Sequence, residues 1–122
     1  MRILVVDDDA MAGEMTGAVL EEMGHVVILS EDGIDAAAKL NTDSGIEMVI
    51  SDMNMPMVSG IDLFRELREQ GSNLPFILLT GDEPAGLLAQ EPRLDACVLK
   101  DFSLEETLPQ VLDDVLAKRG VA

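Results

Sequence analysis

The chain has 122 residues, 48% of them hydrophobic, which is enough length and apolar content for one folded domain. Its 24 acidic residues outnumber its 8 Lys and Arg, and the formal net charge of -16 argues against direct binding to nucleic acid or to an anionic membrane. The single cysteine excludes an intrachain disulfide and a cysteine-rich zinc site, and it fits a reducing compartment such as the cytoplasm.

Five short apolar runs alternate with stretches of helical spacing. The runs have the length of buried parallel strands and span residues 3–6, 26–29, 48–50, 76–79 and 97–99. The longer helical stretches span residues 12–23, 33–40, 60–70 and 104–118. A further helix of about two turns is predicted between Pro84 and Pro92, because proline suits a first turn and excludes a helical residue before it. The alternation predicts an α/β fold with a doubly wound, five-stranded parallel sheet.

Spacing also predicts which helical faces pack on the sheet. The first helix is expected to bury the residues that recur three and four positions apart: Ala12, Met15, Thr16, Val19, Leu20 and Met23. The second is expected to use Ile34, Ala37, Ala38 and Leu40 in the same way.

Chemically related residues follow the predicted strands. Asp7 and Asp8 follow the first run, Asp52 the third, Thr80 the fourth and Lys100 the fifth. In a sheet of order 2-1-3-4-5 these carboxyl ends share one crevice. Two carboxylates 4 Å apart repel by ~4 kcal/mol at an effective dielectric near 20, so either their pKa values rise or a cation lies among them. Oxygen-only ligands favour Mg²⁺, and a hydroxyl with an ammonium beside it suits a phosphoryl group.

The sequence resembles the receiver domain of two-component response regulators. The pieces that carry the resemblance each lie at a predicted strand end: residues 5–8, residues 51–56 with Gly60, residues 79–81 and residues 98–100. The likeness is of the chemotaxis-regulator type and covers residues 1–122 as one domain. It implies a flavodoxin-like fold and a phosphoacceptor signalling domain, rather than an enzyme, that assists its own phosphorylation and dephosphorylation.

The resemblance implies a role for each acidic strand end. Asp52 matches the phosphoacceptor, which takes a phosphoryl group from a phosphohistidine on a sensor histidine kinase or a phosphotransfer protein. Asp8 and Asp52 match direct Mg²⁺ ligands, and Asp7 matches a ligand that acts through water. The backbone carbonyl of Asn54 matches the remaining protein ligand.

The resemblance also implies roles for the residues opposite the acids. Thr80 matches a switch hydroxyl, Lys100 an ammonium that pairs with the phosphoryl group, and Gly81 leaves that group room. Asn54 and Asp82 occupy positions that tune the lifetime of the acyl phosphate. A small amide and an acid there leave room for water, so we expect a lifetime of minutes or less.

Three features depart from the family pattern. Asp101 replaces a proline that normally follows the lysine in a cis peptide, so we expect a trans or strained Lys100–Asp101 bond and an acid that biases the site. Cys97 replaces an aromatic switch residue and is expected to be a small buried hydrophobe. The interval between Thr80 and Lys100 is about two residues shorter than in the chemotaxis-type pattern.

The methionines after Asp52, at positions 53, 55 and 57, have two possible roles. They are either a docking surface or ordinary loop packing.

Three functions remain open at this point. The first is a receiver that is phosphorylated by a kinase or a phosphotransfer protein. Such a receiver can also act on an output domain or a downstream protein, or form a homodimer. The second is a degenerate receiver that only binds partners. The third, a Mg²⁺-dependent phosphatase with an aspartate nucleophile, lacks the second aspartate because Asn54 stands there. The first is favoured because the acids are intact.

Overall fold

The computed structural model describes residues 1–101 and 103–120. Phe102, Val121 and Ala122, which belong to the expected single domain of residues 1–122, lie outside the described residues. The strands are β1 (Arg2–Val6), β2 (Val26–Ser30), β3 (Met48–Asp52), β4 (Phe76–Thr80) and β5 (Ala96–Leu99). The helices are α1 (Ala10–Glu22), α2 (Gly33–Thr42), α3 (Gly60–Glu69), α4 (Pro84–Gln90) and α5 (Leu104–Lys118).

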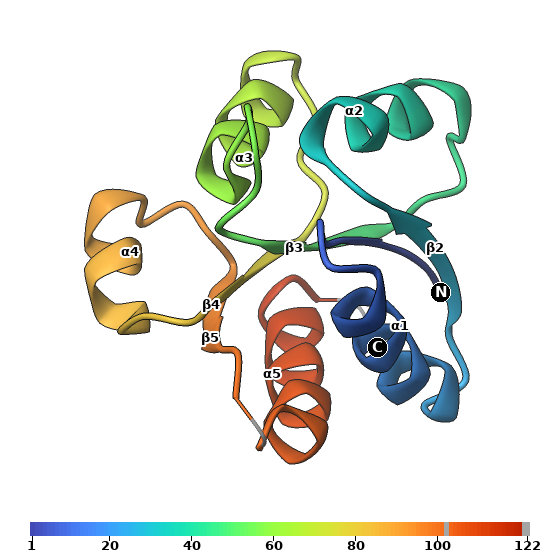
Figure 1. Cartoon of the computed structure of the whole chain (residues 1–122), viewed down its shortest axis with the longest axis vertical. Helices are drawn as coiled ribbons and strands as arrows, with labels where there is room; N and C mark the ends of the chain where they lie inside the picture. The colour runs from blue at the N-terminus through green and yellow to red at the C-terminus, as the bar shows by residue number, and fades with distance from the viewer. Residues whose placement is uncertain (102, 121–122) are drawn as a thin grey trace.

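The five strands form one parallel sheet in the order β2-β1-β3-β4-β5, as predicted. Helices α2 and α3 cover one face of the sheet, α1 and α5 cover the other, and α4 lies beyond β4 and β5 (Figure 1). Because successive strand residues point to opposite faces, Leu4 and Val49 pack under α2 and α3, whereas Val5 and Ile50 pack under α1 and α5. The central strands are therefore apolar on both sides.

Helix α1 packs on the sheet mainly through the predicted face: Thr16 and Leu20 are buried and Val19 packs against the core, and Met15 is the exception. Gly13, Thr16, Gly17 and Leu20 are buried, whereas Met15 is 67% exposed. A Cβ atom at Gly17 would lie 3.2 Å from the side chain of Val27 on β2, so the helix sits closer than a larger residue would permit. Hydropathy spacing gives glycine no weight, which is why Gly13 and Gly17 were missing from the expected face.

The edge strand and the second helix bring further corrections. Val26 and Leu29 of β2 are 54% and 42% exposed, so this strand is not buried on both faces. It lies at the edge of the sheet and has only β1 beside it. Ile34, expected on the packed face of α2, is 57% exposed, and Ala36 is the buried side chain of that helix.

Helix α4 has the predicted two turns and no fully buried residue. A buried carboxylate, that of Glu91, follows it and accepts hydrogen bonds from Arg65 on α3 at 3.1 Å and from Arg93 at 2.7 Å. The hydrogen bonds from Arg93, aided by Arg65, lower the pKa of Glu91 to about 2. This ion pair fixes the end of α4 to α3.

Among the described residues, no helix combines the length and the apolar character that crossing a membrane requires.

Candidate functional site

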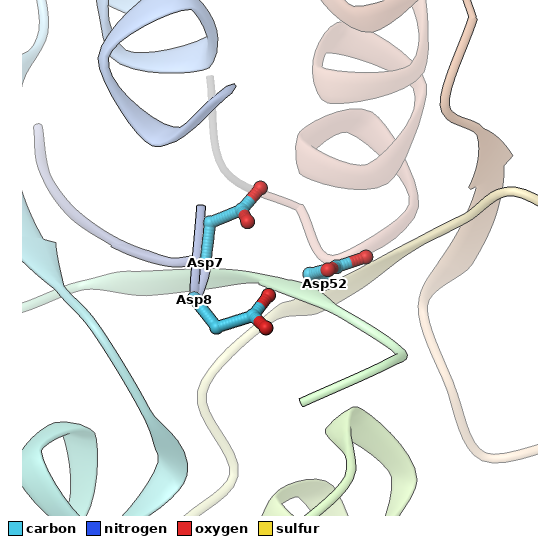
Figure 2. A group of neighbouring side chains, drawn as sticks. All are labelled: Asp7, Asp8 and Asp52. Carbon is cyan, nitrogen blue, oxygen red and sulfur yellow. The ribbon is translucent and has the colours of Figure 1, made fainter. Parts of the chain in front are cut away.

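Three carboxylates meet at the carboxyl ends of β1 and β3, the two central neighbours in the sheet. Each of Asp7, Asp8 and Asp52 offers one oxygen, and these oxygens all lie within 4.8 Å of one another. Figure 2 shows the three side chains entering the same region from the two strand ends. Asp7 and Asp52 are buried, and Asp8 is exposed. The cluster predicted from the strand-end pattern is therefore present.

Local backbone structure fixes the two acids that follow β1. Asp7 accepts a hydrogen bond from the backbone N–H of Asp9 at 2.9 Å. Asp9 in turn is the N-cap of α1 and accepts from the N–H groups of Met11 and Ala12. The chain thus turns from strand to helix within three residues, and this turn holds Asp7 inward beside Asp52.

Lys100 supplies the positive charge of the site. Its Nζ atom donates to Asp7 Oδ2 at 2.6 Å and lies 3.5 Å from Asp52 Oδ2. Burial opposes the ammonium charge, but the hydrogen bond that Lys100 donates to Asp7 and the charge of Asp52 outweigh it, so the pKa of Lys100 is raised. The short bond to Asp7 was not predicted, since nothing in the sequence indicates which carboxylate the lysine contacts.

The pKa of Asp52 is raised, and the main cause is burial. The Lys100 charge opposes this rise, and the charge of Asp7 adds to it. One ammonium thus faces three acids in a partly desolvated place. Excess negative charge with oxygen-only donors fits a hard divalent cation such as Mg²⁺.

The residue after Lys100 does not disturb this arrangement. The described residues contain no cis peptide bond, so the Lys100–Asp101 bond is trans as expected. The carboxylate of Asp101 accepts hydrogen bonds from the N–H and the hydroxyl of Ser103, which lower its pKa. It therefore makes a turn before α5, and no ion pair joins it to Lys100 in the described part of the chain.

The end of β4 brings Thr80 to the same edge of the sheet. Thr80 is fully buried, and its hydroxyl accepts a hydrogen bond from the backbone N–H of Asp82 at 3.0 Å. Asp82 itself is exposed. A Cβ atom at Gly81 would have no neighbour within 4 Å, so packing within the chain does not require glycine there.

Two other expected residues lie on β5 and after β3. Cys97 is half-buried against the core beneath α2 and α3, and burial raises the pKa of its thiol to about 11. It is therefore an unreactive small hydrophobe at neutral pH. Asn54 is exposed on the loop between β3 and α3.

Gly60 holds this loop against the strand, a role that sequence reasoning missed. Its N–H donates to the carbonyl of Met53 at 2.9 Å. A Cβ atom at Gly60 would lie 2.4 Å from Leu78 Cδ1 and 2.6 Å from the carbonyl oxygen of Asp52. Only glycine permits this approach, which fixes the backbone of Asp52.

The sequence model described as "Response regulator receiver domain" matches residues 3–112 of the chain. The chain belongs to this family. Among curated relatives, the receiver domain is 35% identical over 111 residues to the two-component response regulator PhoP of Pseudomonas aeruginosa, a match that covers 87% of this chain and 48% of that protein. It is 35% identical to the response regulator MprA of Mycobacterium avium, with coverage of 91% and 49%. The chain thus spans about half the length of the curated relatives it matches.

Solved structures agree with the fold. The response regulator TrrA from Thermotoga maritima, in complex with Mg(2+)-BeF, superposes with a TM-score of 0.83 at 30% identity and covers 94% of this receiver domain and 98% of that chain. The chemotaxis protein CheY4 of Vibrio cholerae superposes with a TM-score of 0.83 at 28% identity, with the same coverage. The expected receiver family and its flavodoxin-like fold are confirmed.

Proposed function

We propose that Asp52 of this receiver domain accepts a phosphoryl group from the phosphohistidine of a sensor histidine kinase or a phosphotransfer protein. One observation carries the proposal: the Asp52 carboxylate ends a central strand, with two further carboxylates and the ammonium of Lys100 around it. A carboxylate held in place beside a fixed positive charge is suited to attack phosphorus.

The transfer balances with the groups named. A carboxylate oxygen of Asp52 forms a bond to phosphorus as the phosphorus–nitrogen bond of the phosphohistidine breaks. The electron pair of that bond returns to the imidazole nitrogen of the donor, and the product is an acyl phosphate. Lys100, fixed by its bond to Asp7, offsets charge on the oxygens of the transferring group.

The residues of the site fit Mg²⁺ in their chemistry. Asp7, Asp8, Asp52 and the backbone carbonyl of Asn54 are the proposed ligands, and all are oxygen donors. The complex of TrrA with Mg(2+)-BeF supports this choice. When bound, the ion would supply positive charge that offsets the negative charge on the oxygens of the transferring phosphoryl group.

The remaining predicted residues take supporting roles in the proposal. The Thr80 hydroxyl leaves its bond with the N–H of Asp82 to bind a phosphoryl oxygen, and open space at Gly81 admits that group. Asn54 and Asp82 are both exposed and leave water access to the acyl phosphate, so its lifetime is minutes or less. A phosphorylated form that persists for hours in Mg²⁺ contradicts this part.

Cys97 takes no part as a rotating ring, so the conformational change reaches the α4–β5–α5 side by another route. A cytoplasmic location, an output domain elsewhere in the protein and a homodimer belong to the proposal as options, and the length of two relatives supports the output domain. MprA and PhoP are about twice as long as this receiver domain.

The test is an intact-mass measurement after incubation with phosphoramidate and Mg²⁺. We expect a gain of one phosphoryl group, lost without Mg²⁺ and lost in the Asp52→Asn variant. The exposed acid Asp113 provides a control, since Asp113→Asn removes a charge on α5 and retains the gain. No gain with any small donor contradicts the proposal and leaves a domain that only binds partners.

A further inference from the structure

Met57 occupies a backbone conformation that its side chain disfavours. Its φ angle is 68°, and among the described residues it is the one non-glycine with positive φ. Such a backbone costs ~1–3 kcal/mol for a residue with a Cβ atom. The side chain is also 78% exposed, so burial does not offset this cost. Met53 and Met55 of the same loop pack against the core, and Met57 does not.

A tight contact joins the loop of Met57 to a segment that carries a second exposed apolar side chain. A Cβ atom at Gly33, the first residue of α2, would lie 2.9 Å from the Cβ of Val58. Ile34 follows Gly33 and Met57 precedes Val58, so both adjoin this contact. Ile34 is 57% exposed. The Gly33–Val58 contact thus joins the two backbone segments that carry Ile34 and Met57, which are 23 positions apart in the sequence.

The residues that lead into Gly33 and Ile34 are acidic and line a cavity that reaches the site, although Ile34 and Met57 do not line it themselves. A cavity of about 540 Å³ between α1, β2 and α2 is lined by Asp7 of the carboxylate cluster and by Asp32, the N-cap of α2. Glu31 also lines it, and Asp8 beside it is exposed. A surface that covers Ile34 therefore meets the negative charge of Glu31 and Asp32, which directly precede α2.

We infer that Ile34 and Met57 are the apolar anchor for the protein that donates phosphate to Asp52, a partner with an apolar residue flanked by Lys or Arg near its phosphohistidine. The inference rests on the proposed function and names the docking contact of the same site. Asp52 is only 7% exposed, so a protein donor must press against the surrounding surface to bring its histidine to the carboxylate. The loop that carries Met57 leaves β3 directly after Asp52, and complementary charge guides such a donor.

The experiment compares two phosphate donors on the same variants. Phosphoramidate is small and needs no docking surface. The protein donors are the histidine-phosphotransfer domains of the organism that makes this chain, each phosphorylated on histidine beforehand, and the one that transfers fastest is used. The variants are Met57→Gly, Ile34→Gln and the double variant. Val26→Thr is the matched control, because Val26 is nearly as exposed as Ile34 and lies at the opposite end of the sheet.

We expect the double variant to take phosphate from phosphoramidate at the wild-type rate. With the protein donor, kcat/KM should fall by about tenfold or more, mainly through KM, because a docking contact is lost while the chemistry stays intact. The Val26→Thr control should match the wild type with both donors. Circular dichroism and the urea midpoint of each variant confirm that it folds.

Four results overturn the inference. In the first, the double variant accepts phosphate from the protein donor as efficiently as the wild type. In the second, it loses transfer from both donors alike, which makes the pair part of the site itself. In the third, the wild type is phosphorylated by phosphoramidate but by no protein donor. In the fourth, the wild type forms a dimer that the double variant dissociates without changing transfer. Failure with phosphoramidate in the wild type instead contradicts the proposed function.

Discussion

Replacing Gly60 by alanine should destabilise the receiver domain and displace its acceptor. The added methyl group would lie 2.6 Å from the carbonyl oxygen of Asp52 and 2.4 Å from Leu78 Cδ1. Leu78 can change rotamer at a cost of ~0.5–1.5 kcal/mol. The carbonyl belongs to β3 and accepts from the Ser51 hydroxyl, so it moves only with the strand end, at an overpacking cost of ~1–3 kcal/mol. From the Leu78 rotamer change and the displaced Asp52 carbonyl together, we expect the free energy of unfolding to fall by about 2–4 kcal/mol.

Two other glycines serve as internal controls. A Cβ atom at Gly86, in α4, has no neighbour within 4 Å, so Gly86→Ala should stabilise by ~0.5–1 kcal/mol through backbone entropy. Gly17→Ala meets a side-chain methyl at 3.2 Å and should lie between the two. Urea unfolding with unchanged m-values measures all three. A Gly60→Ala variant as stable as the wild type, or a Gly86→Ala variant that loses as much, would refute the packing argument.

Three further outcomes are expected. Met57→Gly should raise the free energy of unfolding by ~0.5–1 kcal/mol, measured in urea, because it relieves the left-handed backbone. Glu91→Gln should be less stable than the wild type at pH 7, and this difference should close as the pH falls from 4.5 towards 2. The reason is that the pKa of Glu91 is lower in the folded than in the unfolded chain, so its ion pairs stabilise the fold above the unfolded pKa and stop doing so as the pH falls through the folded pKa. Mg²⁺ should raise the thermal midpoint of the wild type, with a smaller rise in Asp8→Asn and an unchanged rise in Asp113→Asn. A stability difference between Glu91→Gln and the wild type that stays constant with pH would contradict the second prediction. A rise of the thermal midpoint with Mg²⁺ that is as large in Asp8→Asn as in the wild type would contradict the third.

The order of elements was predictable because each buried strand is a short apolar run, and even the two-turn α4 followed from Pro84 and Pro92. The α1 face was predictable only in part, since its contact with the sheet also uses Gly13 and Gly17, which a hydropathy pattern ignores. The exposure of Val26 and Leu29 follows from the edge position of β2, which depends on strand order rather than on composition.

The carboxylate cluster was predictable because parallel strands bring their carboxyl ends to one edge. The contacts within it were not. The Lys100–Asp7 bond depends on side-chain geometry across 93 residues of separation, and the sequence indicates only that a lysine follows β5. The positive φ of Met57 and the close approach of Gly60 are properties of one loop conformation. Residue types alone do not specify that conformation.

The most direct test of the central claim is to identify the residue that carries the phosphoryl group. The receiver domain is phosphorylated with phosphoramidate and Mg²⁺, reduced with borohydride and digested, because reduction converts an aspartyl phosphate into homoserine. Peptide mass spectrometry should find homoserine at position 52, and none without Mg²⁺. Homoserine at Asp7 or Asp8 instead, or none at any aspartate, would contradict the account.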